Sequence, residues 1–154
     1  MTPTTSADTN LFLYAANRDS PRHDAAARFL SNVGRSGEAG DVFVVCELVL
    51  VELYLLLRNP KVLARPLRSA AAATFCNRLR ANAAWQHVDY DPAVSKPLWN
   101  WAEETSRGFR HIIDARLALT LRHHGVTRFA TANVKHFDGF GFEKVWDPST
   151  SSVG

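Results

Sequence analysis

The chain has 154 residues, of which 46% are hydrophobic and 21% charged, and 18 Lys and Arg residues against 15 Asp and Glu residues leave a formal net charge of +3. This composition is typical of a soluble globular domain, and it excludes an intrinsically disordered chain, a collagen and a disulfide scaffold. The longest apolar region, residues 42–57, contains Glu47 and Glu52. It therefore falls short of the roughly 18 uncharged residues that a membrane span needs, and we expect no association with a membrane.

Strands and helices alternate along the chain. Turn residues and prolines separate short runs of β-branched and aromatic residues from longer segments with helical periodicity. Residues 42–45 show no polar alternation, as in a parallel strand that is covered on both faces. In chain order we predict a strand at about 3–7, helices at 11–17 and 23–33, a strand at 42–45, helices at 47–58 and 65–82, a strand at 85–89, helices at 91–105 and 112–124, and strands at 128–131 and 144–146.

This alternation predicts an α/β fold of three layers, α/β/α, in which a central, mainly parallel sheet lies between two layers of helices. The sequence has no internal repeat, and the glycines at 34, 37 and 40 form a turn too short to be a domain linker. We therefore predict a single domain over residues 1–148 and a disordered tail over 149–154.

Two features predict a cytoplasmic protein. Residues 1–10 are rich in threonine, with no basic start and no apolar segment of the kind that a secretory signal contains. Cys46 and Cys76 lie in apolar or helical stretches, so we expect free thiols in a reducing compartment.

Acidic residues follow the predicted strands, where the active site of a parallel α/β protein lies. Asp8 comes directly after the first strand, and Glu52 stands alone in the apolar helix that follows the second. A buried carboxylate without a partner is costly, so a metal ion or a cationic side chain is expected beside Glu52. Glu47 is a competing candidate, but five helical residues place it about 140° from Glu52, so the two cannot enter one site.

Asp114 opens the helix predicted over 112–124, and the following strand returns to the same rim. The helix rises by roughly 16 Å and the strand covers about the same distance, which brings Thr131 and Asn133 back toward Asp114. Oxygen ligands that converge at one rim, with no Cys or His at zinc spacing, favour Mg²⁺ or Mn²⁺. Two other interpretations stay open: Asp8 and Asp114 as helix caps, and Glu52 as the partner of an arginine.

Five stretches resemble the PIN-domain ribonucleases of the VapC toxin type. They occur in the order found in that family and span residues 8–137, almost the whole chain. The stretches are Asp8-Thr9-Asn10-Leu11-Phe12-Leu13-Tyr14-Ala15, His23-Asp24-Ala25-Ala26, Val51-Glu52-Leu53-Tyr54, Ile113-Asp114-Ala115-Arg116-Leu117-Ala118 and Ala130-Thr131-Ala132-Asn133-Val134-Lys135-His136-Phe137.

The resemblance implies a PIN-like fold with a site for Mg²⁺ or Mn²⁺. By that resemblance Asp8, Glu52 and Asp114 are acidic metal ligands, Asn133 occupies a fourth position that is often acidic, and Thr131 assists by hydrogen bonding. The neutral Asn133 departs from the family pattern and weakens the case for a second metal ion. A second departure is the threonine-rich first strand, which is usually apolar in the family.

The same resemblance implies a cytoplasmic, metal-dependent endoribonuclease that acts as the toxin of a type II toxin–antitoxin system. Its implied partners are RNA, a VapB-like antitoxin whose peptide covers the acidic site, and a second copy of the chain in a homodimer. Two alternatives stay open: a PIN-type nuclease in RNA processing or on structured DNA, and a catalytically degenerate binding module.

Basic residues near Asp114 are candidates for substrate binding because a nuclease must contact phosphates. A solvated basic loop explains any one of them equally well. His136 and Asp138 lie beside Asn133, where a turn explains both. The candidate substrate-binding residues are Asn10, Arg107, Arg110 and Arg116, together with His111 as a further phosphate-binding candidate.

Overall fold

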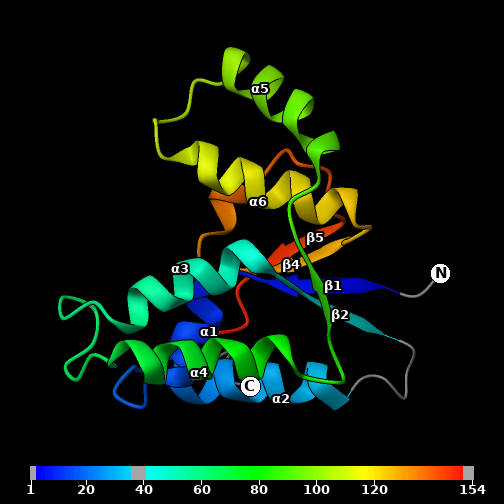
Figure 1. Ribbon diagram of the computed structural model, residues 1–154. Helices are drawn as coiled ribbons and strands as arrows, with labels where there is room; N and C mark the ends of the chain where they lie inside the picture. The colour runs from blue at the N-terminus through cyan, green and yellow to red at the C-terminus, as the bar shows by residue number, and fades with distance from the viewer. Residues whose placement is uncertain (1–2, 36–40, 151–154) are drawn as a thin grey trace.

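The computed structural model describes residues 3–35 and 41–150, and it contains a five-stranded sheet in the order β3-β2-β1-β4-β5 (Figure 1). Every neighbouring pair of strands is parallel, as the unbroken apolar character of residues 42–45 predicts. The strands are β1 (Thr4–Ala7), β2 (Val42–Cys46), β3 (Gln86–Val88), β4 (Arg128–Ala130) and β5 (Lys144–Trp146).

Helices cover both faces of this sheet, so the predicted three-layer α/β/α architecture is confirmed. In Figure 1, α5 and α6 lie above the sheet, whereas α1, α2 and α4 lie below it. The helices are α1 (Thr9–Ala16), α2 (His23–Arg35), α3 (Glu47–Leu57), α4 (Ser69–Arg80), α5 (Ser95–Glu104) and α6 (His111–His123), with short 3₁₀ turns η2 (Pro92–Val94) and η3 (Val134–Phe137).

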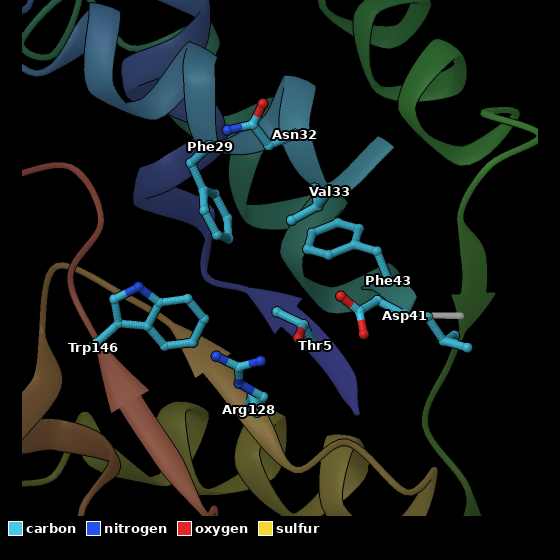
Figure 2. Close-up of a pocket in the computed structure, with 9 residues that line it drawn as sticks. Thr5, Phe29, Asn32, Val33, Asp41, Phe43, Arg128 and Trp146 are labelled. Atoms are coloured by element: carbon cyan, nitrogen blue, oxygen red, sulfur yellow. The ribbon is translucent and has the colours of Figure 1, made fainter. Parts of the chain in front are cut away.

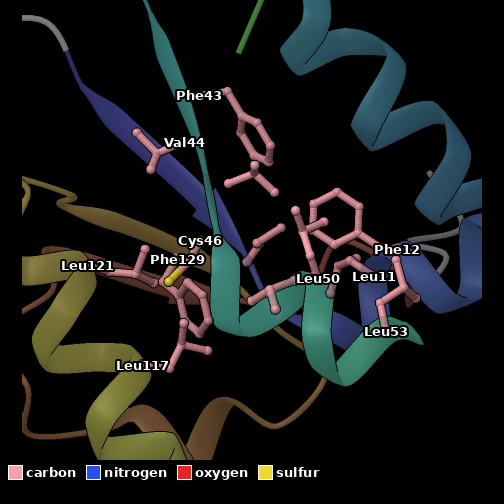
Figure 3. Close-up of a cluster of buried hydrophobic side chains, with 14 of the residues drawn as sticks. Leu11, Phe12, Phe43, Val44, Cys46, Leu50, Leu53, Leu117, Leu121 and Phe129 are labelled. Carbon is pink, nitrogen blue, oxygen red and sulfur yellow. The ribbon is translucent and has the colours of Figure 1, made fainter. Parts of the chain in front are cut away.

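The core lies on both sides of the sheet and joins the two helical layers to it (Figure 3). On one side, Phe12 of α1 and Leu50 of α3 pack with Phe43 of β2, and all three are at most 2% exposed. On the other side, Leu121 of α6 packs beside Phe129 of β4. Because burial of each such side chain contributes roughly 1.5–3 kcal/mol, this packing fixes the strand ends from which the polar residues project.

The connections reverse direction at β1, and this reversal positions the candidate site. The chain proceeds from β1 to β2 and then β3 on one side, and it crosses to β4 and β5 on the other. In open parallel sheets a ligand site lies beyond the carboxyl ends of the two strands where this reversal occurs. Here these strands are β1 and β4, which end immediately before Asp8 and Thr131.

The structure corrects the predicted start of one helix. The helix predicted from residue 65 begins at Ser69, because the N–H of Leu67 bonds to the carbonyl of Leu57 at 2.8 Å and Arg68 is extended. An extended segment that is tied back to α3 cannot also make helical hydrogen bonds.

The predicted boundary of the tail also differs. Ser149 is buried and its hydroxyl donates to Asp147 at 2.5 Å, so ordered structure continues past residue 148. The rest of the predicted tail, residues 151–154, and most of the predicted glycine-rich turn, residues 36–40, lie outside the described residues.

Both cysteines are free and buried, as predicted. Burial raises the pKa of the Cys46 thiol to about 11, which keeps it protonated and unreactive at neutral pH. Among the described residues, no helix is both long enough and apolar enough to cross a bilayer.

Candidate functional site

Asp8 lies at the junction between β1 and α1, and its carboxylate is held by two hydrogen bonds. One carboxylate oxygen accepts from the N–H of Thr9 at 2.8 Å and caps the helix, and the other accepts from the hydroxyl of Thr131 at 2.8 Å. The backbone N–H of Asp8 donates to the carbonyl of Ala130 at 2.8 Å. The predicted capping role is therefore confirmed, and each carboxylate oxygen keeps a lone pair for a further ligand.

Burial controls the ionisation of Asp8, which is 7% exposed. Loss of hydration raises the pKa of its carboxyl group to about 6, even though the hydrogen bonds from Thr131 and Thr9 lower it. The charge of Asp114 raises the pKa of Asp8 further.

Glu52 is half-buried on α3 and has no hydrogen bond or ion pair within the described part of the chain. The predicted alternative of an arginine partner therefore finds no support there. Burial raises the pKa of the Glu52 carboxyl group to about 7, and the charges of Asp8 and Asp114 contribute to this rise. A half-buried carboxylate whose nearest charges are two other carboxylates is stabilised by a cation.

Asp114 lies in the first turn of α6, which follows α5 and not a strand, whereas Asp8 directly follows β1 and Glu52 lies within the helix after β2. Burial raises the pKa of the Asp114 carboxyl group, and the imidazoles of His136 and His111 act in the opposite direction. The charges of Asp8 and Asp114 both act on Glu52, so the three acids influence one another electrostatically. Among the described residues their carboxylate oxygens do not all lie within 4.8 Å of one another, so the assignment of the three acids to one metal site stays a prediction.

Thr131 and Asn133 return to this rim after β4, as the lengths of α6 and β4 predict. Thr131 is fully buried, and its hydroxyl oxygen accepts from the backbone N–H of Asn133 at 3.0 Å. The side-chain oxygen of Asn10 accepts from the N–H of Ala132 at 3.2 Å, so Asn10 holds the segment after β4 in place. Asn133 itself is exposed.

Replacing Asn133 by Asp is expected to tighten Mn²⁺ binding by roughly 5- to 30-fold, because an added carboxylate at this rim contributes about 1–2 kcal/mol of attraction. The same change should lower the melting temperature of the metal-free protein, since it adds a fourth negative charge. Calorimetric titration and thermal melts measure both effects, with Asn100→Asp on the exposed face of α5 as the control. Unchanged Mn²⁺ affinity and unchanged melts would place Asn133 outside the metal site.

Glu47 points away from the acidic group, as the helical geometry predicts. It forms an ion pair with Arg80 and a contact of 2.7 Å with the imidazole Nε2 of His87. Burial alone would raise the pKa of Glu47, but hydrogen bonds from Arg80 and His87 lower it overall. Glu47 therefore links α3 to α4 and β3.

The three candidate arginines differ in how they are engaged. Arg107 donates to the carbonyl oxygens of His136 and Asp138, the latter at 3.0 Å, and so supports the loop beside Asp114. Arg116 stacks on Tyr90, with its guanidinium carbon 4.2 Å from the ring centre. Arg110 lies 5.5 Å from the ring of Phe109, which is 86% exposed.

Sequence reasoning did not identify the relation of two histidines to Asp114. His111 Nδ1 lies 3.5 Å and His136 Nδ1 lies 3.4 Å from the same Asp114 oxygen, Oδ2. The three-residue spacing of His111 and Asp114 on one helix is a signal that could have paired them. His136 comes from η3, and its approach depends on the fold. The sequence, which has no histidine at zinc spacing, did not predict that these two residues lie beside Asp114.

A separate pocket of about 230 Å³ lies at the opposite end of the sheet, beside the first residues of β1, β2 and β4 (Figure 2). Figure 2 shows Arg128 and Trp146 on one side of this pocket and Phe29 and Asp41 on the other. It holds none of the three converging acids and lies at the amino ends of the strands, so it is not the candidate catalytic site.

The acidic group can hold a divalent cation through carboxylate oxygens, with Thr131 fixing the orientation of Asp8. Oxygen donors of this kind fit Mg²⁺ or Mn²⁺. A cation in such a group can stabilise negative charge on a bound phosphate and promote its hydrolysis.

Comparisons with known proteins show which family the chain resembles. Residues 7–142 match the model of the PIN domain family. The chain is 52% identical over 147 residues to Ribonuclease VapC24 of Mycobacterium tuberculosis, a match that covers 95% of this chain and 97% of that protein.

Two solved structures share the fold. Mycobacterium tuberculosis VapC20, described as a toxin that cleaves the sarcin-ricin loop, has a TM-score of 0.60 at 19% identity, covering 81% of this chain and 86% of that one. VapBC2 from Rickettsia felis, bound to a DNA fragment from its promoter, has a TM-score of 0.64 at 14% identity. The match covers 94% of this chain and 99% of that one. At these identities the two structures bear on the fold alone.

Proposed function

The chain belongs to the PIN-domain family and to the VapC ribonucleases within it, and from that premise we propose that Asp8, Glu52 and Asp114 form the metal site of an endoribonuclease toxin. The single observation that carries this assignment is the convergence of three carboxylates, with no paired arginine at Glu52 in the described chain, beyond the strands where the sheet reverses direction. The reaction is hydrolysis of an RNA phosphodiester bond with Mg²⁺ or Mn²⁺ as cofactor.

The residues of the chain mainly supply placement. Thr131 holds one oxygen of Asp8, and the start of α1 holds the other, so this carboxylate has a fixed direction. Glu52 and Asp114 face it from α3 and α6. A bound divalent ion would lower the pKa of a bound water molecule and would stabilise the negative charge on the phosphate. Asn133 contributes a neutral amide at the rim in place of a fourth charge.

Arg110 is the strongest of the candidate phosphate contacts. Its guanidinium makes no hydrogen bond to any described residue, and it precedes the helix that carries Asp114. Arg107 and Arg116 are already engaged with backbone carbonyls and with Tyr90, so they support the site and bind substrate less directly. Asn10 acts by positioning the segment after β4.

The proposed partners are RNA, a VapB-like antitoxin and a second copy of the chain, in the cytoplasm. The 52% identity to Ribonuclease VapC24 over nearly the whole chain supports a VapB-like antitoxin partner here. Exposed apolar side chains on α3, Val51 at 51% and Leu55 at 62%, offer surface for such contacts.

Incubating the purified chain with RNA tests the function. We expect cleavage in Mg²⁺ or Mn²⁺, loss of cleavage in chelator, and recovery when metal is restored. DNA of the same sequence and structure serves as the matched substrate. Divalent-dependent cleavage of the DNA alone would favour the structured-DNA nuclease, and binding of RNA without turnover in either metal would favour the binding module.

A further inference from the structure

Two imidazoles flank Asp114 at the outer side of the acidic group. His111 is the first residue of α6, and His136 lies in η3, which follows β4. One ligand atom from each of His111, Asp114 and His136 lies within 4.8 Å of the other two. The side chains of His111 and Asp114 are 25% and 30% exposed, so the cluster is partly shielded from solvent and still open to it.

The distances within this cluster are compatible with coordination of one ion, and the contact between His136 and Asp114 also acts as a weak hydrogen bond that lowers the pKa of Asp114. The two separations between Nδ1 and Oδ2, 3.5 Å and 3.4 Å, exceed the 2.7–3.2 Å of ordinary N–H···O bonds. Two donors that each lie about 2.0–2.1 Å from one tetrahedral ion are separated by roughly 3.3–3.4 Å. The His111 Nδ1 atom is also buried from solvent and has no hydrogen-bond partner. This nitrogen therefore forms no hydrogen bond and is available to coordinate an ion beside Asp114.

We propose that His111, Asp114 and His136 form a second metal site. This site binds Zn²⁺ or a similar ion such as Co²⁺, and it shares Asp114 with the acidic centre. Two imidazole nitrogens and one carboxylate oxygen favour Zn²⁺ or Co²⁺ over Mg²⁺, which prefers oxygen ligands throughout. Three protein ligands leave the fourth tetrahedral position to water.

Sharing Asp114 gives this site a regulatory consequence. An ion held by the two histidines draws Asp114 away from Glu52 and Asp8 and weakens Mg²⁺ binding at the acidic centre. This consequence rests on the proposed function, whereas the metal site itself does not. We therefore expect Zn²⁺ to suppress RNA cleavage supported by Mg²⁺, and replacement of either histidine to relieve the suppression.

Titration of the metal-free full chain with Zn²⁺ and Co²⁺ tests the site. We expect His111→Gln and His136→Gln each to weaken Zn²⁺ binding at least tenfold and to change Mg²⁺ affinity less than threefold. His123→Gln is the matched control, because His123 lies 3.4 Å from Asp91 at the other end of α6 and has the same type of contact with a carboxylate. It should leave Zn²⁺ affinity unchanged.

The visible absorption of Co²⁺ gives a second measurement on the wild-type chain. We expect the intense bands of a tetrahedral nitrogen and oxygen site, and weaker, altered bands in both imidazole variants. Zn²⁺ affinities within threefold of wild type in both variants, or Co²⁺ spectra identical to wild type, would overturn the site.

The outcomes separate this site from the proposed function. Zn²⁺ binding that depends on His111 and His136, in a chain that cleaves no RNA, supports the site and contradicts the function. RNA cleavage combined with a Zn²⁺ affinity that is unchanged in both histidine variants supports the function and contradicts the site.

Discussion

Replacing Glu52 by Gln is expected to lower the rate of RNA cleavage at saturating Mg²⁺ by at least about 100-fold while leaving the fold intact. The amide keeps the size of the side chain and removes one of three ligand charges, and a lost metal ligand typically costs several kcal/mol of transition-state stabilisation. Glu52 makes no hydrogen bond within the described chain, so the change breaks no structural contact. Single-turnover cleavage assays and circular dichroism measure the two effects.

Glu47→Gln is the matched control for this experiment. It makes the same chemical change on the same helix, five residues earlier, and it disrupts the contacts with Arg80 and His87. We expect it to lower stability slightly and to leave cleavage within about threefold of wild type, since a partly exposed ion pair contributes roughly 0–1 kcal/mol. Asp8→Asn and Asp114→Asn should resemble Glu52→Gln. Near-normal cleavage by Glu52→Gln, or equal losses in the two glutamate variants, would show that the catalytic site lies elsewhere.

The metal-free protein is expected to lose stability as the pH rises from about 4 to about 7. In the folded chain the pKa is about 6 for Asp8 and about 7 for Glu52, against ordinary values of 3.8 and 4.5 in the unfolded chain. At a pH between the unfolded and the folded pKa of each group, the folded state binds more protons than the unfolded state. The free energy of unfolding therefore falls as the pH rises. For the buried Asp8 this loss is on the order of 3 kcal/mol.

Urea unfolding at pH 4 and pH 8 in the presence of chelator measures this loss. Saturating Mn²⁺ should reverse it, because the ion binds only the folded site and does so more tightly when the carboxylates are ionised. Asp8→Asn should reduce the difference in unfolding free energy between the two pH values and should stabilise the metal-free chain at pH 8. A metal-free protein that is equally stable or more stable at pH 8 would contradict the inference that burial, and to a lesser extent repulsion from neighbouring carboxylates, raises the pKa of Asp8 and Glu52.

The positions of the three acids could be predicted from local sequence. Asp8 directly follows a β-branched and threonine-rich strand, Glu52 interrupts a helix that is otherwise apolar, and Asp114 opens a helix whose length returns the chain to the same rim. In a parallel sheet the carboxyl ends of all strands lie on one edge, so these residues could be placed on that edge before the strand order was known. The divergence of the Glu47 and Glu52 side chains could likewise be predicted from the 3.6 residues per turn of an α-helix.

What the tertiary structure alone decided is which side chains meet across elements that are distant in sequence. The contact of His136 with Asp114 depends on how η3 turns after β4, and the pairing of Glu47 with Arg80 depends on how α4 packs on α3. Arg107 and Arg116 are equally basic in the sequence, but the fold directs one to backbone carbonyls and stacks the other on Tyr90. These contacts follow from loop conformation and side-chain packing, which local propensity and periodicity do not specify. The sequence by itself therefore determined the layered fold and the three acids, and tertiary packing determined the partners that surround them.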